Sequence, residues 1–116
     1  MPSDSTALGL PMPRVTAQVE PYVQALGPDM AVTFLLAFGG AELPIAAVPT
    51  ERAEYVRLIG HDKAQALAAV AHRLPPRVPL AKKWLAEMLH WRGYSSAHIA
   101  RTLRVTDVSV RRWFKG

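Results

Sequence analysis

The stretch SAHIARTLRVTDVSVRRWFK, residues 96–115, has the apolar spacing of two short helices joined by a tight turn. The first predicted helix ends at Leu103, residues 104–106 form the turn, and the second helix runs over residues 107–115. Two steeply crossing helices need apolar side chains at fixed offsets and a small residue where the backbones meet. The residues at those inward offsets are Ile99, Ala100, Leu103, Val105, Val110 and Trp113. The pattern predicts a helix-turn-helix, with Arg104 where a glycine commonly relieves the turn.

A supporting helix is expected immediately before this motif. Pro79 is well placed at a helix start, residues 80–92 carry the helical pattern, and Gly93 ends it. The apolar face of this helix consists of Trp84, Leu85, Met88 and Leu89. Ser95 or Ser96 can then cap the first helix of the motif.

In a helix-turn-helix, the first turns of the second helix face the major groove of double-stranded DNA. Arg112, followed by Arg111, is the best candidate for direct base reading, because arginine can donate a paired hydrogen bond to guanine O6 and N7. Thr106 is a candidate N-cap and a candidate contact to phosphate or base, and Asp107 either caps the helix or selects cytosine N4. Arg101, Arg104 and Lys115 are expected on phosphates. The expected DNA-binding residues are Ser96, Arg101, Arg104, Thr106, Asp107, Ser109, Arg111, Arg112 and Lys115.

Positive charge is concentrated toward the C-terminal end. Residues 1–51 hold one base against five acids, a net charge of −4, whereas residues 52–116 hold thirteen bases against four acids, a net charge of +9. A basic segment of this kind attracts a polyanion and raises its encounter rate. The distribution alone is also typical of a solvated basic surface.

Composition argues against an enzyme. The chain of 116 residues fits one compact domain or two very small ones, and it has no cysteine for disulfides, thiol nucleophiles or cysteine-type zinc sites. The four histidines are scattered without a His-Glu-x-x-His spacing, so no metal, cofactor or catalytic residue is expected. No apolar run approaches the ~20 residues that span a bilayer, and no secretion leader is recognisable. A cytoplasmic protein is expected.

An internal repeat precedes the basic segment. Residues 22–31, YVQALGPDMA, align with residues 55–64, YVRLIGHDKA, at an offset of 33, with five of ten positions identical. Each copy predicts a helix, a glycine break and a second helix that begins near an aspartate, which makes an αα unit. Two such units can bury their apolar faces against each other within one chain or by swapping between two chains. A homodimer is therefore expected, and the choice between the two packings stays open.

The expected fold class is mainly α, with duplicated αα units and a short edge strand followed by a C-terminal helix-turn-helix. Residues 1–14 are expected to be a flexible tail, residues 15–79 the duplicated helical dimerisation region, and residues 80–116 the DNA-binding domain. After an apolar helix face built on Met30, Phe34 and Phe38, a left-handed cap at Gly39 and Gly40 leads into the edge strand over residues 42–46. Three prolines keep residues 74–79 extended.

The segment FGGAELPI at residues 38–45, the repeated Leu/Ile-Gly-x-Asp element and the terminal motif resemble the Mor transcription activator family of phage and prophage origin. The resemblance covers residues 19–115. It implies a dimeric, nucleoid-associated activator that reads a dyad site near a promoter and contacts RNA polymerase. It also implies a short strand that pairs across the dimer, here around residues 43–46 or 77–80.

Two other functions are compatible with the same residues. The terminal helices could bind another protein, as in a small adaptor, or they could form the DNA-recognition subunit of a recombination or packaging complex. The sequence leaves open activation against repression, the operator sequence, the regulated genes and the polymerase contact.

Overall fold

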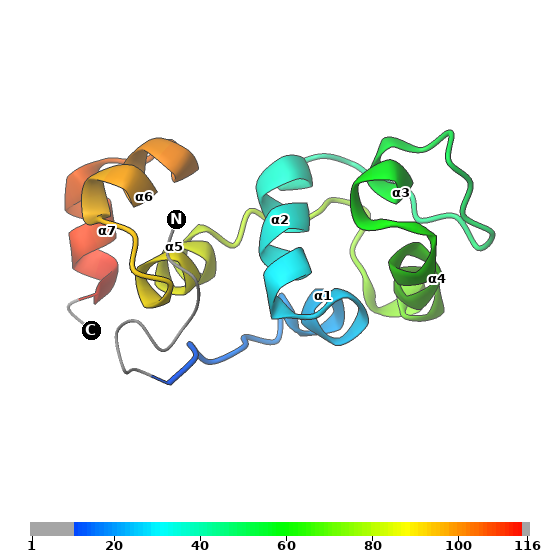
Figure 1. The fold of residues 1–116 in the computed structure, drawn as a ribbon, viewed down its shortest axis with the longest axis horizontal. Coiled ribbons are helices and arrows are strands. Elements are labelled where there is room, and N and C mark those ends of the chain that lie inside the picture. Colours follow the sequence, from blue (N-terminus) through cyan, green and yellow to red (C-terminus); the bar gives the residue numbers. More distant parts are fainter. Residues whose placement is uncertain (1–10, 115–116) are drawn as a thin grey trace. The chain divides into compact units, whose positions relative to one another are not determined.

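A computed structural model describes residues 11–114 of the chain; residues 1–10 and 115–116 lie outside the described part. Within the described range there are seven α-helices, one short 3-10 helix and no strand. The expectation of a mainly α fold is therefore confirmed. The chain divides into two compact units, one of residues 15–81 and one that joins residues 11–14 to residues 82–114 (Figure 1).

The unit of residues 15–81 is built from two pairs of helices. The helices are α1 (Glu20–Leu26), α2 (Pro28–Phe38), α3 (Glu54–Ile59) and α4 (His61–Ala69), followed by the 3-10 helix η2 (Ala71–Arg73). Helix α1 packs against α2 and α4, and α3 packs against α4 and α2. The core side chains include Tyr22, Leu26, Phe34, Leu35, Tyr55, Ile59 and Leu67. Of the predicted α2 face, Phe34 is fully buried, and Met30 and Phe38 are half-buried.

A single glycine joins the two helices of each pair. Gly27 has φ 83° and ψ 158°, and Gly60 has φ 90° and ψ 161°. Residues with a side chain almost never adopt this region of backbone space. At each junction the glycine N–H donates to a valine carbonyl of the preceding helix, Val23 or Val56, at 2.8 Å. The chain therefore turns from one helix into the next without a longer loop.

The predicted edge strand over residues 42–46 is wrong in extent. The described chain forms only one isolated antiparallel bridge, between Glu42 and Arg77. Pro76 explains the limit, because it lies opposite Leu43 and has no N–H to return the hydrogen bond that the Leu43 N–H donates to its carbonyl. The left-handed cap is also shifted: Gly39 has φ −53°, and Gly40 has φ 89°.

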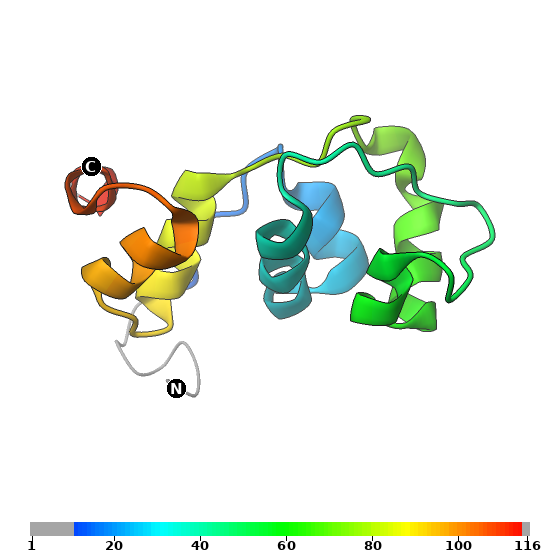
Figure 2. The same cartoon turned by 90° about the horizontal axis from the view of Figure 1, so that it is seen from above.

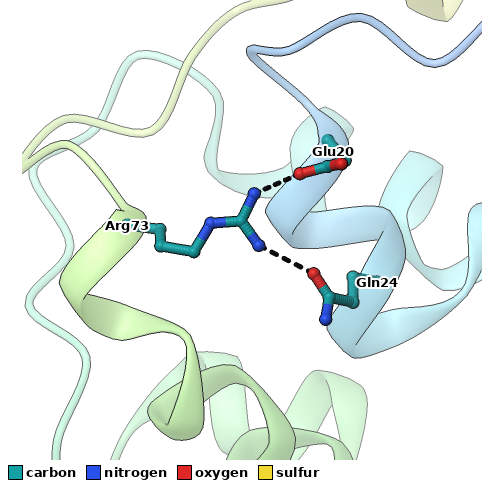
Figure 3. A network of polar contacts seen from close by, with 3 residues as sticks. All are labelled: Glu20, Gln24 and Arg73. Atoms are coloured by element: carbon teal, nitrogen blue, oxygen red, sulfur yellow. Dashed lines mark hydrogen bonds and ion pairs between the residues drawn. The ribbon is translucent and has the colours of Figure 1, made fainter.

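Polar contacts also join the two helix pairs. The Arg73 guanidinium, just after α4, forms an ion pair with the Glu20 carboxylate on α1 and donates to Gln24 Oε1 at 2.7 Å (Figure 3). Lys63 Nζ on α4 donates to the carbonyl of Leu26, the last residue of α1, at 3.0 Å. A lysine in this position satisfies a carbonyl that the end of a helix leaves unpaired.

The second unit contains α5 (Lys82–Trp91), α6 (Ser96–Leu103) and α7 (Asp107–Phe114), each packed against the other two. The predicted buried face of α5 is confirmed, since Trp84, Leu85, Met88 and Leu89 are all buried. The predicted start of this helix is wrong by two residues. Ala81 takes a positive φ of 49°, which places Pro79 and Leu80 outside the helix.

The described part of the predicted N-terminal tail, residues 11–14, has no regular secondary structure. Pro11, Pro13 and Arg14 line a hollow of about 420 Å³ together with side chains of α5 and α7. The remainder of that tail lies outside the described residues. None of the helices in residues 11–114 is both long and apolar enough to cross a membrane.

Candidate nucleic-acid interface

Helix α6 begins at a serine cap. Ser95 Oγ accepts a hydrogen bond from the His98 N–H at 3.1 Å, so Ser95 is the cap and Ser96 is the first helical residue. The His98 ring stacks on the Tyr94 ring with centroids 4.6 Å apart. The cap and the stack fix the start of α6.

The turn between α6 and α7 depends on Arg104. This residue adopts the left-handed conformation, with φ 59° and ψ 44°, where the sequence pattern commonly has glycine. Its N–H donates to the Ala100 carbonyl, and the Val105 N–H donates to the same carbonyl at 3.0 Å. The left-handed conformation costs a residue with a side chain roughly 1–2 kcal/mol. Arg104 is exposed, so its side chain stays available at the surface.

Helix α7 begins at a threonine cap. Thr106 Oγ1 accepts from the Ser109 N–H at 3.1 Å, and the Thr106 hydroxyl donates to Ser109 Oγ at 3.0 Å. The prediction that Thr106 is the N-cap is therefore confirmed. The Ser109 hydroxyl is held by the same cap and the residue is half-buried, which makes Ser109 a weak candidate for contact with a ligand.

Asp107 does not cap α7. Its carboxylate Oδ2 lies 3.8 Å from Nη1 of Arg111, one turn further along the helix. Both side chains are largely exposed, so the pair contributes at most a few tenths of a kcal/mol. A carboxylate in the first turn also lies favourably at the positive end of the helix dipole.

The inner side of the α6–α7 pair follows the predicted apolar offsets. Four of the six predicted inward residues are buried: Ile99, Ala100, Leu103 and Val110. The other two, Val105 and Trp113, are half-buried. Next to Trp113, the Phe114 ring stacks on the His90 ring of α5 with centroids 4.4 Å apart.

The outer face of α7 presents Val108, Arg111 and Arg112. All three are exposed, and Val108 is 55% exposed despite its apolar side chain. Val108 lies three and four residues before the two arginines, so it shares their helix face. Val108 was not among the predicted DNA-binding residues, which are all polar or charged; the sequence signal for it is this spacing to the two arginines.

The other predicted site residues are distributed around this face. Arg101 is exposed on α6, Ser96 is half-buried at the first position of α6, and Arg104 is exposed on the turn. Lys115 lies outside the described residues. Arg101, Arg104 and Arg112 have no ion-pair partner among residues 11–114, whereas Arg111 is paired with Asp107.

The basic charge of the chain belongs to the sequence that carries α5, α6 and α7. Residues 82–116 contain eight Lys and Arg against two acids, a net charge of +6. Residues 15–81 contain five Lys and Arg against six acids, a net charge of −1. The excess positive charge therefore lies on the sequence of α5, α6 and α7, whereas the unit of residues 15–81 is close to neutral.

The hollow beside α5 and α7 is lined mainly by aromatic and charged side chains. Its walls include His90, Trp91, Trp113 and Phe114, with Lys83 and Glu87 on α5. Over residues 11–114 there is no cluster of three or more His, Asp or Glu that could hold a metal ion. Comparison of the chain with models of protein families, with curated proteins and with solved structures found no match.

Proposed function

We propose that the chain is a sequence-specific regulator of transcription that binds double-stranded DNA through α6 and α7, which act as a helix-turn-helix. The observation that carries this proposal is the two-sided character of α7. Val110 anchors its back in the core, while Arg111 and Arg112 project from its front. This helix belongs to the strongly basic part of the chain. A helix that is capped at its start, buried on one side and lined with arginines on the other is suited to insertion into a major groove.

Each exposed group on this face has a distinct expected role. Arg112 is the first candidate for reading guanine, because no described acid competes for its guanidinium. Arg111 must leave its ion pair with Asp107 before it can contact DNA, so Asp107 affects how readily Arg111 binds. Val108 can contact the methyl group of thymine. Arg101 and Arg104 are expected to contact phosphates, which position the protein without specifying sequence.

The proposal that this regulator is an activator of phage or prophage genes rests on the resemblance to the Mor family. RNA polymerase would then be a further partner, and the protein would act in the cytoplasm on the nucleoid. A homodimer was expected because two αα units must bury their apolar faces. The structure buries those faces within one chain, so only the resemblance still supports a homodimer.

The test removes both arginines from the recognition face. Arg111→Ala with Arg112→Ala should reduce affinity for recovered genomic sites at least tenfold, because a good arginine–guanine pair is worth about 1–3 kcal/mol. Gel-shift titration at several salt concentrations measures the affinity and its salt dependence. A matched control, Arg52→Ala with Arg57→Ala, removes the same charge from exposed positions of the other unit and should bind nearly as well.

The outcomes separate the proposal from its alternatives. Unchanged duplex binding by the Arg111/Arg112 variant would show that α7 is not the recognition helix. A folded wild-type chain with no salt-dependent duplex binding would favour a protein-interaction adaptor. Specific binding in the genome without any change in transcription of neighbouring genes would favour the DNA-recognition subunit of a recombination or packaging complex.

A further inference from the structure

The two helix pairs of residues 15–81 have matching local structure. The pairs Tyr22 and Tyr55, and Phe34 and Leu67, lie 33 residues apart, and all four side chains are at most 2% exposed. The same offset relates the two junction glycines, whose backbone angles agree within 7°. We call residues 20–43 the first half and residues 54–78 the second half.

The helix contacts between the halves are reciprocal. The first helix of the first half packs on the second helix of the second half, α1 on α4, and the converse contact joins α3 to α2. Exchanging the halves leaves this list of contacts unchanged. Such reciprocity is the property of an isologous, two-fold interface, which two identical subunits would form across a dimer.

The extended segments that end each half are also paired with each other. On either side of the Glu42–Arg77 bridge, the Val78 N–H donates to the Ala41 carbonyl at 2.8 Å and the Leu43 N–H to the Pro76 carbonyl at 3.2 Å. Figure 2 shows these two segments running side by side. The segments that could pair across a dimer therefore pair within the chain.

The side-chain contacts at this pairing reinforce it. Arg77 donates to the Gly40 carbonyl at 2.8 Å and to Glu42 Oε1 at 3.2 Å. The large apolar side chains that remain exposed in this unit are Leu36, Val48, Leu58 and Leu80. They lie on α2, the following loop, α3 and the segment before α5, rather than along one helix face.

We infer that one chain occupies its DNA target alone, at an asymmetric site with a single recognition element. The inference rests on the proposed function and adds the class of DNA site. Each self-paired scaffold carries one α6–α7 pair, whereas a two-fold dimer would carry two and would require a dyad. The two halves pack and pair with each other within one chain, so this interface needs no second chain.

A disulfide trap tests the pairing, because the natural chain has no cysteine to interfere. The Glu42–Arg77 pair is of the antiparallel type without direct hydrogen bonds between the two residues. Such pairs have Cα atoms about 4.5 Å apart, which is within the range that a disulfide spans. The full chain carrying Glu42→Cys with Arg77→Cys should oxidise to a 12.7 kDa monomer with no free thiol on a non-reducing gel. A covalent dimer as the main product would overturn the inference.

Single-cysteine chains provide the matched controls. Glu42→Cys alone and Arg77→Cys alone should each keep one titratable thiol and remain mostly monomeric. Crosslinked dimer from the double variant well above that of both controls would indicate pairing between chains.

The DNA arm uses the oxidised double variant and the wild-type chain on the same recovered duplex. Light scattering should give one chain per duplex. When each flank of the footprint is randomised in turn, binding should depend on one recognition element and not on two. Two chains per duplex on a dyad would overturn the inference and leave the proposed function standing. Absence of duplex binding by the folded wild-type chain would overturn both.

Discussion

Replacing either junction glycine with alanine should destabilise the unit of residues 15–81 by a similar amount. A side chain forced into the backbone region of Gly27 and Gly60 costs about 1–3 kcal/mol. At either site an added Cβ would have no described atom within 4 Å, so no clash adds to the cost. Alanine also restricts the unfolded chain, which returns about 0.4–1 kcal/mol. The expected net loss is about 1–2 kcal/mol for Gly27→Ala and for Gly60→Ala.

Urea unfolding followed by circular dichroism at 222 nm measures this loss. With a slope of about 1–2 kcal/mol per molar urea, each substitution should lower the midpoint by roughly 1 M. Gly39→Ala provides a contrast in mechanism, because Gly39 has an ordinary φ but its Cβ would lie 2.7 Å from the Leu35 carbonyl oxygen. A loss below about 0.5 kcal/mol at Gly27 or Gly60, or a loss at only one of them, would refute the reasoning from matched junctions.

Three further predictions concern single side chains. Thr106→Ala should cost about 1 kcal/mol of stability in the unit of residues 82–114, measured by tryptophan emission in urea, whereas Thr106→Ser should recover most of it; equal stability of all three chains would refute the cap. Arg104→Gly should raise stability by about 1 kcal/mol, because glycine carries no penalty at φ 59°, and yet reduce the salt dependence of DNA binding by roughly 0.9 in the logarithmic slope. An unchanged slope would exclude a phosphate contact by Arg104. Burial raises the pKa of the Tyr22 phenol in the folded state. The contribution of Tyr22 to the free energy of unfolding is therefore complete below about pH 10, where the phenol is protonated in the folded and the unfolded chain. This contribution is lost as the pH rises, because the phenol of the unfolded chain ionises first. Tyr22→Phe should flatten the decline in urea midpoint between about pH 9.5 and 11.5, and an identical decline would assign it to another group.

Local pattern was sufficient to predict most of the buried side chains of the C-terminal unit. Ile99, Leu103 and Val110 were identified from spacing alone, because a helix places residues three and four apart on one face whatever surrounds it. The threonine cap was predictable for the same reason, since its partner is only three residues away. These features depend on neighbours in sequence.

The errors arose where the conformation depends on distant contacts or on an unusual backbone. Nothing local marks Ala81 as a residue with positive φ, so Pro79 was given the start of a helix that begins at Lys82. The strand over residues 42–46 was overestimated because its length depends on a partner segment more than 30 residues away, which is also rich in proline. Val108 was missed because only polar and charged side chains were considered as contacts to DNA, and its exposure depends on which face of α7 packs on the core.

The choice between internal pairing and swapping could not be read from the sequence, but chain connectivity favours one outcome. Residues 39–53 join the first helix pair to the second, and about 15 residues span up to ~50 Å when extended, so the linker permits either arrangement. Such a linker presents one half to the other at an effective concentration on the order of 1 mM. A second chain at about 1 µM is a thousandfold more dilute, a difference of about 4 kcal/mol in favour of pairing within the chain. Swapping would prevail only if the linker were strained by that amount in the monomer. Shortening the linker should therefore be the change that converts this chain into a dimer.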